Sequence, residues 1–232
     1  MINPIMKLKG SSSIREEYKK TLKLTKGQKN ILIGTLLGDG CLTTRSKKGK
    51  YPTFNYQFKQ KESKKDYVYH IFEKFQNLCG SYPVRVKQGQ SLVNDEILYA
   101  WSFKTGTIPA LKFYADQFYS LDNNLGKSIK VVPKLIHRWL TPEALAYWYM
   151  DDGSKDSSGY RLHTQCFSIK EVERLADALG KNFKFEVNIH KAKNKKTGKI
   201  YYLLYITSKS REAFTKIVLP YILPCCKYKL FI

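Results

Sequence analysis

Two nine-residue stretches, Leu32–Gly40 (LIGTLLGDG) and Leu145–Gly153 (LAYWYMDDG), decide the fold of this chain. Each is an apolar run of helical length that ends in Asp followed by Gly. A helix that is apolar on nearly every side must be buried. Gly34 and Gly38 lie four residues apart on one helix face, where a second backbone can approach closely. The two runs therefore predict two buried helices that pack side by side.

Each apolar run places a carboxylate at a helix C-terminus, which is the electrostatically unfavourable end for an acid. If the two helices pack together, Asp39 and Asp152 are expected to meet, with the carbonyls of Gly38 and Asp151 nearby. Like charges held close need a cation between them, and an all-oxygen cluster suits Mg²⁺. The alternative for either stretch alone is an ordinary buried helix followed by Gly. The pair, in a strongly basic chain, favours a metal site.

Both stretches resemble the LAGLIDADG signature of homing endonucleases, and the second is the closer match. The resemblance implies that Asp39 and Asp152 are the acidic metal ligands. It further implies Mg²⁺ as the cofactor, with Mn²⁺ able to substitute and Ca²⁺ binding without supporting cleavage. The sequence departs from the signature at Tyr147 and Trp148 in the second copy, and at Leu37 and Met150, where the signature has its first Asp. That first Asp is not the essential one in the family, so the assignment of the two acids stands.

The charge balance indicates an acidic polymer as partner. The 232 residues contain 41 Lys and Arg against 19 Asp and Glu, a formal net charge of +22, which is typical of proteins that bind nucleic acid. No apolar run reaches the ~18–20 residues of a membrane span, and no signal peptide opens the sequence, so a membrane or secreted protein is not expected. The five Cys form no C-x-x-C pair, which argues against a disulfide framework or a zinc site.

The order of elements repeats once along the chain. Asp39 and Asp152 are 113 positions apart, and each half has the pattern helix–strand–strand–helix–strand–strand–helix. In the first half we expect helices over 25–37, 63–80 and 107–118, and strands within 41–61 and over 82–88 and 96–104. In the second half we expect helices from 141, over 168–180 and from 208–210 to before 220, and strands up to 167 and over 183–191 and 200–207.

This repetition predicts an α+β fold made of two pseudo-symmetric α-β-β-α-β-β-α repeats. Each repeat contributes an antiparallel, saddle-shaped sheet with helices on one face only. The expected boundaries are a basic N-terminal arm over 1–24, a first repeat over 25–126, a linker over 127–140 and a second repeat over 141–232. Because both repeats lie in one chain, the molecule is expected to act as a monomer on a site that need not be palindromic.

The uncovered face of each sheet must be solvated or bound to something. The alternation of residues along the strands predicts the following side chains there: Thr43, Arg45, Asn55, Gln57, Lys59, Arg85, Lys87, Arg161, His163, Gln165, Glu186, Asn188 and His190. Arg, Asn, Gln and Lys are residue types that read base edges in a major groove. Two basic turns, with Lys47 and Lys48 in one and Lys193 in the other, are expected to grip phosphates. The alternative is an ordinary solvated sheet face.

Taken together, the sequence predicts a metal-dependent, intron-encoded DNA endonuclease that cuts both strands of a long asymmetric site. Water attacks the phosphorus in line and the 3′-oxygen leaves. Lys130 and Lys229 come from matching places near the ends of the repeats. They are the candidates for orienting or polarising the attacking water, and the resemblance supports both.

Three alternatives remain open from the sequence. The chain could be an RNA maturase that assists intron splicing, a DNA-binding protein of this fold that does not cut, or a structural ribosomal protein. Retention of both acids favours cleavage but leaves room for intron RNA as a second partner. The family's usual home implies an organelle, mitochondrion or chloroplast, or a microbial cytoplasm.

Overall fold

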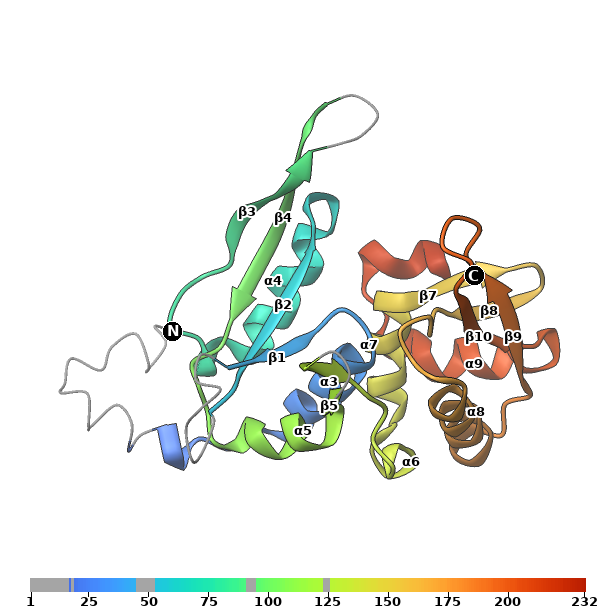
Figure 1. Ribbon diagram of the computed structural model, residues 1–232, viewed down its shortest axis with the longest axis horizontal. Coiled ribbons are helices and arrows are strands. Elements are labelled where there is room, and N and C mark those ends of the chain that lie inside the picture. Colours follow the sequence, from blue (N-terminus) through green and yellow to red (C-terminus); the bar gives the residue numbers. More distant parts are fainter. Residues whose placement is uncertain (1–16, 18, 45–52, 91–94, 123–125) are drawn as a thin grey trace. The chain divides into compact units, whose positions relative to one another are not determined.

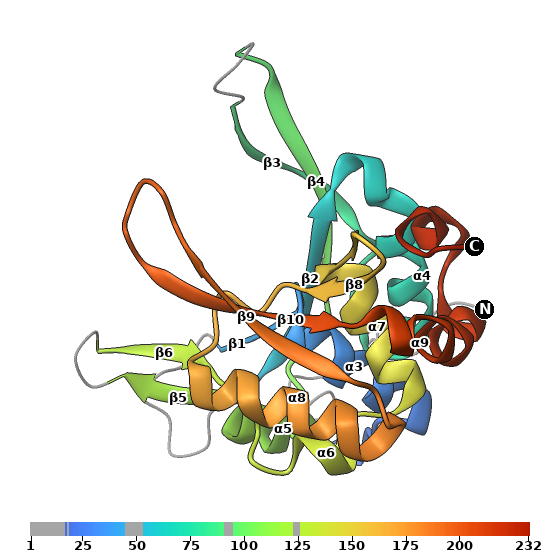
Figure 2. The same ribbon diagram turned by 90° about the vertical axis from the view of Figure 1, so that its right-hand side faces the viewer.

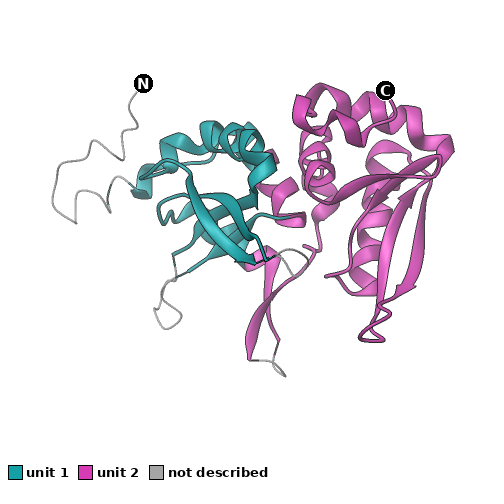
Figure 3. Ribbon diagram, turned by 90° about the horizontal axis from the view of Figure 1, so that it is seen from above, with its two compact units in different colours: residues 1–29, 39–115 teal, residues 30–38, 116–232 magenta. Residues whose placement is uncertain are grey.

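A computed structural model describes residues 17, 19–44, 53–90, 95–122 and 126–232. Most of the expected N-terminal arm, and Arg45, Lys47 and Lys48 of the first basic turn, lie outside these residues. The chain divides into two compact units (Figure 3). Unit 1 contains residues 1–29 and 39–115, and unit 2 contains residues 30–38 and 116–232. Each unit is described by itself below.

Unit 1 is a four-stranded antiparallel sheet with a helix against one face (Figure 1). Its elements are β1 (Cys41–Thr43), β2 (Asn55–Lys61), α4 (Lys65–Phe75), β3 (Val84–Gln90), β4 (Ile97–Lys104) and the start of α5 (Ala110–Phe118). The strand order is β1-β2-β4-β3. The expected alternation along β2 is confirmed from Tyr56 to Lys59, since Tyr56 and Phe58 are fully buried while Lys59 is exposed. Asn55, which was expected to face outward, is buried at 9% exposure, where it hydrogen-bonds Thr43.

The core of unit 1 forms where α4 lies across the sheet. Its apolar residues recur at helical spacing, so Val68, Ile71 and Phe75 are all fully buried. The rings of Tyr56 and Phe75 have centroids 5.0 Å apart, and such aromatic pairs add to the stabilisation from burial. The expected helix over 63–80 is shorter than predicted, because 3₁₀ turns replace its ends over 62–64 and 76–78.

Unit 2 repeats this architecture and adds to it (Figure 2). Its elements are β5 (Tyr119–Asp122), β6 (Lys127–Lys130), α6 (Ile136–Trp139), α7 (Pro142–Asp152), β7 (Gly153–Asp156), β8 (Gly159–Leu162), α8 (Ile169–Phe183), β9 (Val187–Lys193), β10 (Ile200–Ile206) and α9 (Arg211–Val218), together with most of α3 (Lys26–Leu37). The main sheet has the order β7-β8-β10-β9, and α8 contacts β9 and β10.

Two of the additional elements, β6 and α6, fall where a linker was expected, and β5 falls at the end of the expected first repeat. β5 and β6 form a separate antiparallel hairpin, and α6 follows it, so residues 127–140 are partly regular structure. α8 runs three residues beyond Gly180, and Lys184 ends it in the left-handed conformation with φ 61°. Within the described residues, no helix is both long and apolar enough to cross a membrane.

The expected capping signals are present at α7 and α8. Thr141 accepts a hydrogen bond from the Ala144 N–H, and Pro142 occupies the first turn of α7. Ser168 and Glu171 form a reciprocal capping box at the start of α8. Such boxes satisfy backbone donors that a helix start leaves unpaired, and they fix where each helix begins.

Candidate metal and nucleic-acid site

The two signature helices pack unusually close within unit 2. A Cβ atom placed on Gly34 of α3 would lie 2.3 Å from the carbonyl oxygen of Ala144 in α7. One placed on Gly38 would lie 2.5 Å from the Cβ of Asp151. Only glycine leaves room for these approaches. The expected side-by-side packing of residues 30–38 against α7 is therefore confirmed.

The contacts between these helices join equivalent positions of the two repeats. Asn30 donates a hydrogen bond of 2.7 Å from its Nδ2 to Oε2 of Glu143, and the two residues are 113 positions apart. The same offset separates Gly34 from Tyr147, whose Cβ would lie 2.8 Å from a Cβ on the glycine. It also separates the Gly38 and Asp151 pair. Contacts between equivalent positions are the mark of a twofold relation, so the helix pair is pseudo-twofold.

Asp39, the residue after Gly38, is exposed and lines a pocket of unit 1. Gln60 donates a hydrogen bond from its Nε2 to Oδ2 of Asp39. The pocket has a volume of about 440 Å³ and is lined by Asp39, Cys41, Gln57, Lys59, Gln60, Lys61 and Gln88. It therefore combines one carboxylate with two lysines and three amide side chains, a set suited to a phosphate with a cation.

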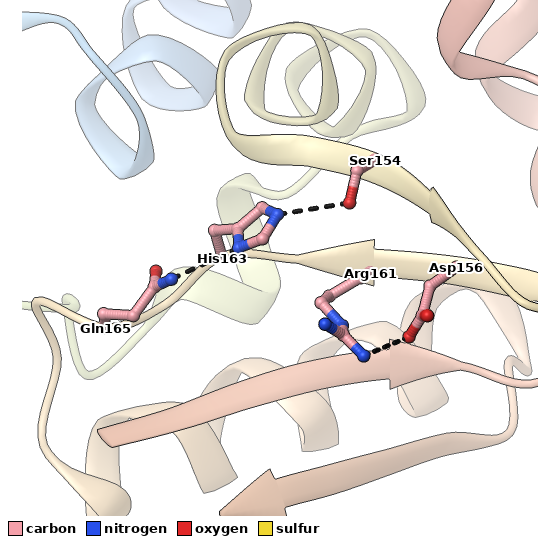
Figure 4. Close-up of polar contacts among 5 residues, drawn as sticks. All are labelled: Ser154, Asp156, Arg161, His163 and Gln165. Atoms are coloured by element: carbon pink, nitrogen blue, oxygen red, sulfur yellow. Dashed lines mark hydrogen bonds and ion pairs between the residues drawn. The ribbon is translucent and has the colours of Figure 1, made fainter. Parts of the chain in front are cut away.

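Asp152 is half-buried at the end of α7, and its carbonyl accepts a 2.9 Å hydrogen bond from the N–H of His163. The His163 ring lies between Ser154 Oγ, 3.1 Å from Nε2, and Gln165 Nε2, 3.2 Å from Nδ1 (Figure 4). Burial, together with the positive charges of Arg161 and Lys229, holds the pKa of His163 below its ordinary value. A neutral ring can accept from Gln165 and donate to Ser154.

The two candidate lysines hold the C-terminal ends of the two signature helices. Lys130 donates a 2.7 Å hydrogen bond from Nζ to the carbonyl of Gly38. Lys229 is only 8% exposed and donates from Nζ to the carbonyls of Met150 at 2.7 Å and Asp151 at 3.2 Å. A cation at this end of a helix is favourable because the carbonyls carry partial negative charge. Both lysines therefore offset the charge at the helix ends where the two acids stand.

The donor set around each acid fits a hard divalent cation. In the described part of the chain, no cluster of three or more His, Cys, Asp or Glu side chains is placed to hold a metal ion. The candidate metal ligands are therefore carboxylate and carbonyl oxygens. Asp39 and Asp152, with the carbonyls of Gly38 and Asp151, are such oxygens, and Mg²⁺ prefers oxygen ligands. Mg²⁺ usually binds through one or two carboxylates plus phosphate oxygens and water, so one acid in each unit is a fitting anchor.

The open face of the unit 1 sheet carries several of the expected polar side chains. Thr43 hydrogen-bonds Asn55 from the neighbouring strand, and Gln57 donates to Ser102 Oγ at 3.4 Å. Lys59 of β2 lies directly opposite Ser102 of β4 in the strand pairing. On this face Thr43 and Lys59 are exposed and Gln57 is half-buried, whereas Asn55 and Ser102 are buried beneath them.

The expectation that Arg85 and Lys87 lie on the open face of the sheet is wrong. Arg85 pairs with Trp101, whose ring packs on Tyr69 of α4 with centroids 5.6 Å apart. The Arg85 guanidinium donates hydrogen bonds to both carboxylate oxygens of Glu62, at 2.6 and 3.0 Å. Lys87 is on the same side as Arg85 by alternation. The open face of β3 carries instead Val84, Val86 and Gln88.

In unit 2 the expected side chains lie on the open face. Arg161 forms an ion pair with Asp156 (Figure 4). His190 stacks on Tyr205 with ring centroids 5.1 Å apart, and Asn188 pairs with Tyr205 in the sheet.

Two other expected contact residues of unit 2 lie at the edges of β9. Glu186 precedes the strand and forms an ion pair with Lys209 at 3.1 Å, so its carboxylate is already engaged. Lys193 is exposed at the far end of β9, next to the basic turn in which it was expected to grip phosphate. Its assignment to DNA binding stays a prediction.

Sequence reasoning missed Gln60 and Gln88. Alternation puts Gln60 on the core side of β2 with Tyr56 and Phe58, and it is 8% exposed. A polar side chain at a core-facing position needs a hydrogen-bond partner, and that mismatch was the available signal. Gln88 stands at a β-bulge between Lys87 and Gly89, where pairing is interrupted, and alternation gives no warning of a bulge.

A family model described as the LAGLIDADG DNA endonuclease family matches residues 29–214. The chain belongs to this family. The DNA endonuclease I-ChuI of Chlamydomonas applanata is 35% identical over 216 residues, covering 90% of this chain and 96% of that protein. The cytochrome b mRNA maturase bI2 of Saccharomyces cerevisiae is 34% identical over 206 residues, covering 87% of this chain but 46% of the maturase.

Solved structures agree with this assignment. The homing endonuclease I-WcaI, solved bound to its DNA recognition sequence, has a TM-score of 0.80 and 30% identity, with 100% of this chain and 99% of that chain covered. I-DmoI in complex with DNA and Mn has a TM-score of 0.54 at 18% identity, covering 85% of this chain and 99% of that one, and shares the fold. The expected α+β fold with two antiparallel four-stranded sheets is confirmed.

Proposed function

We propose that this protein is a monomeric homing endonuclease that makes a double-strand break in a long asymmetric DNA site by metal-dependent hydrolysis. One observation carries the proposal. Each signature helix ends in an acid, and the carbonyl just before each acid, in Gly38 or Asp151, is held by a lysine. Two equivalent acids in one chain suit two DNA strands, one acid for each. The likeness to I-WcaI supports DNA as the substrate.

The residues have separate roles in this reaction. Asp39 and Asp152 are proposed to hold Mg²⁺ with the carbonyls of Gly38 and Asp151. When bound, Mg²⁺ supplies positive charge that activates the scissile phosphate and stabilises the leaving 3′-oxygen. Gln60 fixes the carboxylate of Asp39 by its hydrogen bond.

The two lysines at the helix ends complete the proposed site. Lys130 and Lys229 are proposed to orient or polarise the attacking water from their places at the ends of α3 and α7. The polar open faces of the two sheets bind the major groove. Within the chain, residues 25–126 and 141–232 are the proposed repeats, preceded by a basic arm over 1–24.

Cleavage of a randomised duplex library with Mg²⁺ tests this function, with Asp39→Asn and Asp152→Asn beside the native protein. We expect the native protein to select one long asymmetric sequence and cut both strands. Either substitution should abolish the double-strand break. Asp177→Asn is the matched control, since Asp177 is an exposed acid of α8 paired only locally with Lys181 in the ion pairs described, and it should cut normally.

The maturase reading is the second candidate, because a maturase is among the relatives that cover most of this chain. Tight binding of intron RNA without cleavage of any duplex would replace the nuclease with that function. Tight duplex binding without cleavage would indicate a DNA-binding protein of the same fold. The proposed setting is an organelle or a microbial cytoplasm, as for an intron-encoded protein.

A further inference from the structure

The open face of unit 1 has an apolar end that its polar residues do not explain. Val84 on β3 is 53% exposed and Leu98 on β4 is 46% exposed. Val86 is half-exposed beside them. Large apolar side chains grouped on a folded surface usually mark a binding surface. We define this group, Val84, Val86 and Leu98, as the apolar patch.

The strand pairing joins the apolar patch to the polar surface proposed to bind DNA. One cross-strand row runs Lys59, Ser102 and Val84 across β2, β4 and β3. The next row on the same face ends in Val86 opposite Ala100. A single ligand that covers Lys59 and Ser102 therefore reaches Val84 as well. In a chain of net charge +22, a polyanion is the ligand that suits this surface.

The chemistry of the major groove then selects what the valines contact. Every base pair presents hydrogen-bonding groups there, and the C5-methyl of thymine is the apolar one. A valine side chain can neither donate nor accept a hydrogen bond, so its favourable contact is with that methyl group. The matching position of the second repeat differs. Counted from the equivalent buried pairs Phe58–Phe103 and Leu162–Leu204, Val84 corresponds to His190.

We propose that unit 1 recognises thymine methyl groups through Val84 and Val86, whereas unit 2 reads its half of the site through hydrogen bonds from Asn188 and His190. The inference rests on the proposed function, since it names a feature of the DNA that the same surface binds. Unit 1 thereby adds apolar contact by Val84 and Val86 on its outer strand to the polar groups of β2.

The test replaces each thymine of the selected site, one at a time, by deoxyuridine, which lacks only the methyl group. Binding is measured with the protein that carries both Asp39→Asn and Asp152→Asn, so that affinity is read without cleavage of either strand. We expect two or more positions in one half of the site to bind about fourfold more weakly each, the factor that corresponds to one buried CH₂. Thymines in the other half should be far less sensitive.

Matched variants assign the effect to the apolar patch. Val84→Ser with Val86→Ser removes the γ-methyl groups that are proposed to contact thymine, and this protein should bind the thymine and deoxyuridine duplexes equally. Ile97→Ser is the control, because Ile97 is 46% exposed on β4 but on the side of Tyr99 and Trp101, and it should keep the discrimination.

The outcomes separate this inference from the proposed function. If the native site is bound and cut but no deoxyuridine weakens binding, the inference is overturned and the nuclease function stands. Discrimination that survives in the double serine variant also overturns it. If no duplex is bound at all, the proposed function fails and this inference fails with it.

Discussion

Replacing Gly34 by alanine tests the close approach of the two signature helices. The new Cβ would lie 2.3 Å from the carbonyl oxygen of Ala144 and 2.8 Å from the Cβ of Tyr147. The first of these atoms is backbone, so no rotamer change relieves the clash, and the helices must separate by about 1 Å to reach ordinary contact. Overpacking of a tight core costs about 1–3 kcal/mol, and an immovable neighbour favours the upper end.

The helix propensity of alanine offsets part of this loss. Alanine is better than glycine inside a helix by about 1 kcal/mol, so the net destabilisation expected for Gly34→Ala is about 2 kcal/mol. In a chain of this size, 1 kcal/mol shifts the Tm by about 2–4 °C. The expected fall in Tm is therefore about 4–8 °C, measured by circular dichroism on the full chain.

The control lies in the same helix. Gly27 has no heavy atom within 4 Å of an added Cβ, so Gly27→Ala should keep the native Tm or raise it slightly. If Gly34→Ala melts as high as Gly27→Ala, the two signature helices do not pack as closely as described. The pseudo-twofold contact argued from them would then be refuted.

Three further predictions concern single side chains. Gln60→Leu removes the hydrogen-bond donor to Asp39 and should slow cleavage of one DNA strand about 10- to 100-fold. Denaturing gels measure the cleavage of each strand, and equal slowing of both strands would contradict this prediction. Lys229→Met leaves the last carbonyls of α7 without their buried cation and should lower the free energy of unfolding by about 1–3 kcal/mol. An unchanged Tm would contradict this prediction. Burial raises the pKa of the Cys79 thiol to about 12, so at pH 8 it stays protonated and iodoacetamide should label Cys225, which is exposed, but not Cys79. Mass spectrometry of the native protein checks this, with the unfolded protein as control, and native labelling of Cys79 would contradict it.

The parts of the fold that the sequence predicts are those governed by local rules. The capping box of Ser168 and Glu171 and the alternation along β2 depend on residues within a few positions of one another. The signature helices are predictable because a helix that is apolar on all sides is stable only when it is buried. The offset of 113 residues between the two signatures then implies that the second half of the chain repeats the helices and strands of the first half.

The orientation of β3 could not be predicted in this way. Val84, Arg85, Val86 and Lys87 alternate equally well with either set toward the core, and hydrophobicity alone favours the valines there. β3 is the edge strand next to β4, and both of its faces are largely exposed, so burial does not fix which set faces the helix. The choice is made by tertiary partners, here the carboxylate of Glu62 that holds Arg85.

The β5–β6 hairpin was missed for a related reason. Its strands, YSLD and KSIK, have no apolar face to bury, and their side chains are mostly exposed. The hairpin is held by its own backbone pairing, with Tyr119 opposite Lys130. Nothing in hydrophobic periodicity predicts such a ribbon, yet it is the element that carries Lys130 to the end of α3.

The pseudo-twofold contacts also explain why the second signature departs from the first. In a symmetric dimer, residues on the axis meet their own copies, so a small residue at one helix must be small at both. Here Gly34 meets Tyr147 and Gly38 meets Asp151. A glycine in α3 makes room for a larger residue in α7, which is possible only after the two copies lie in one chain. The bulk of Tyr147 therefore does not loosen the helix pair, because the complementary glycine on α3 allows the close approach.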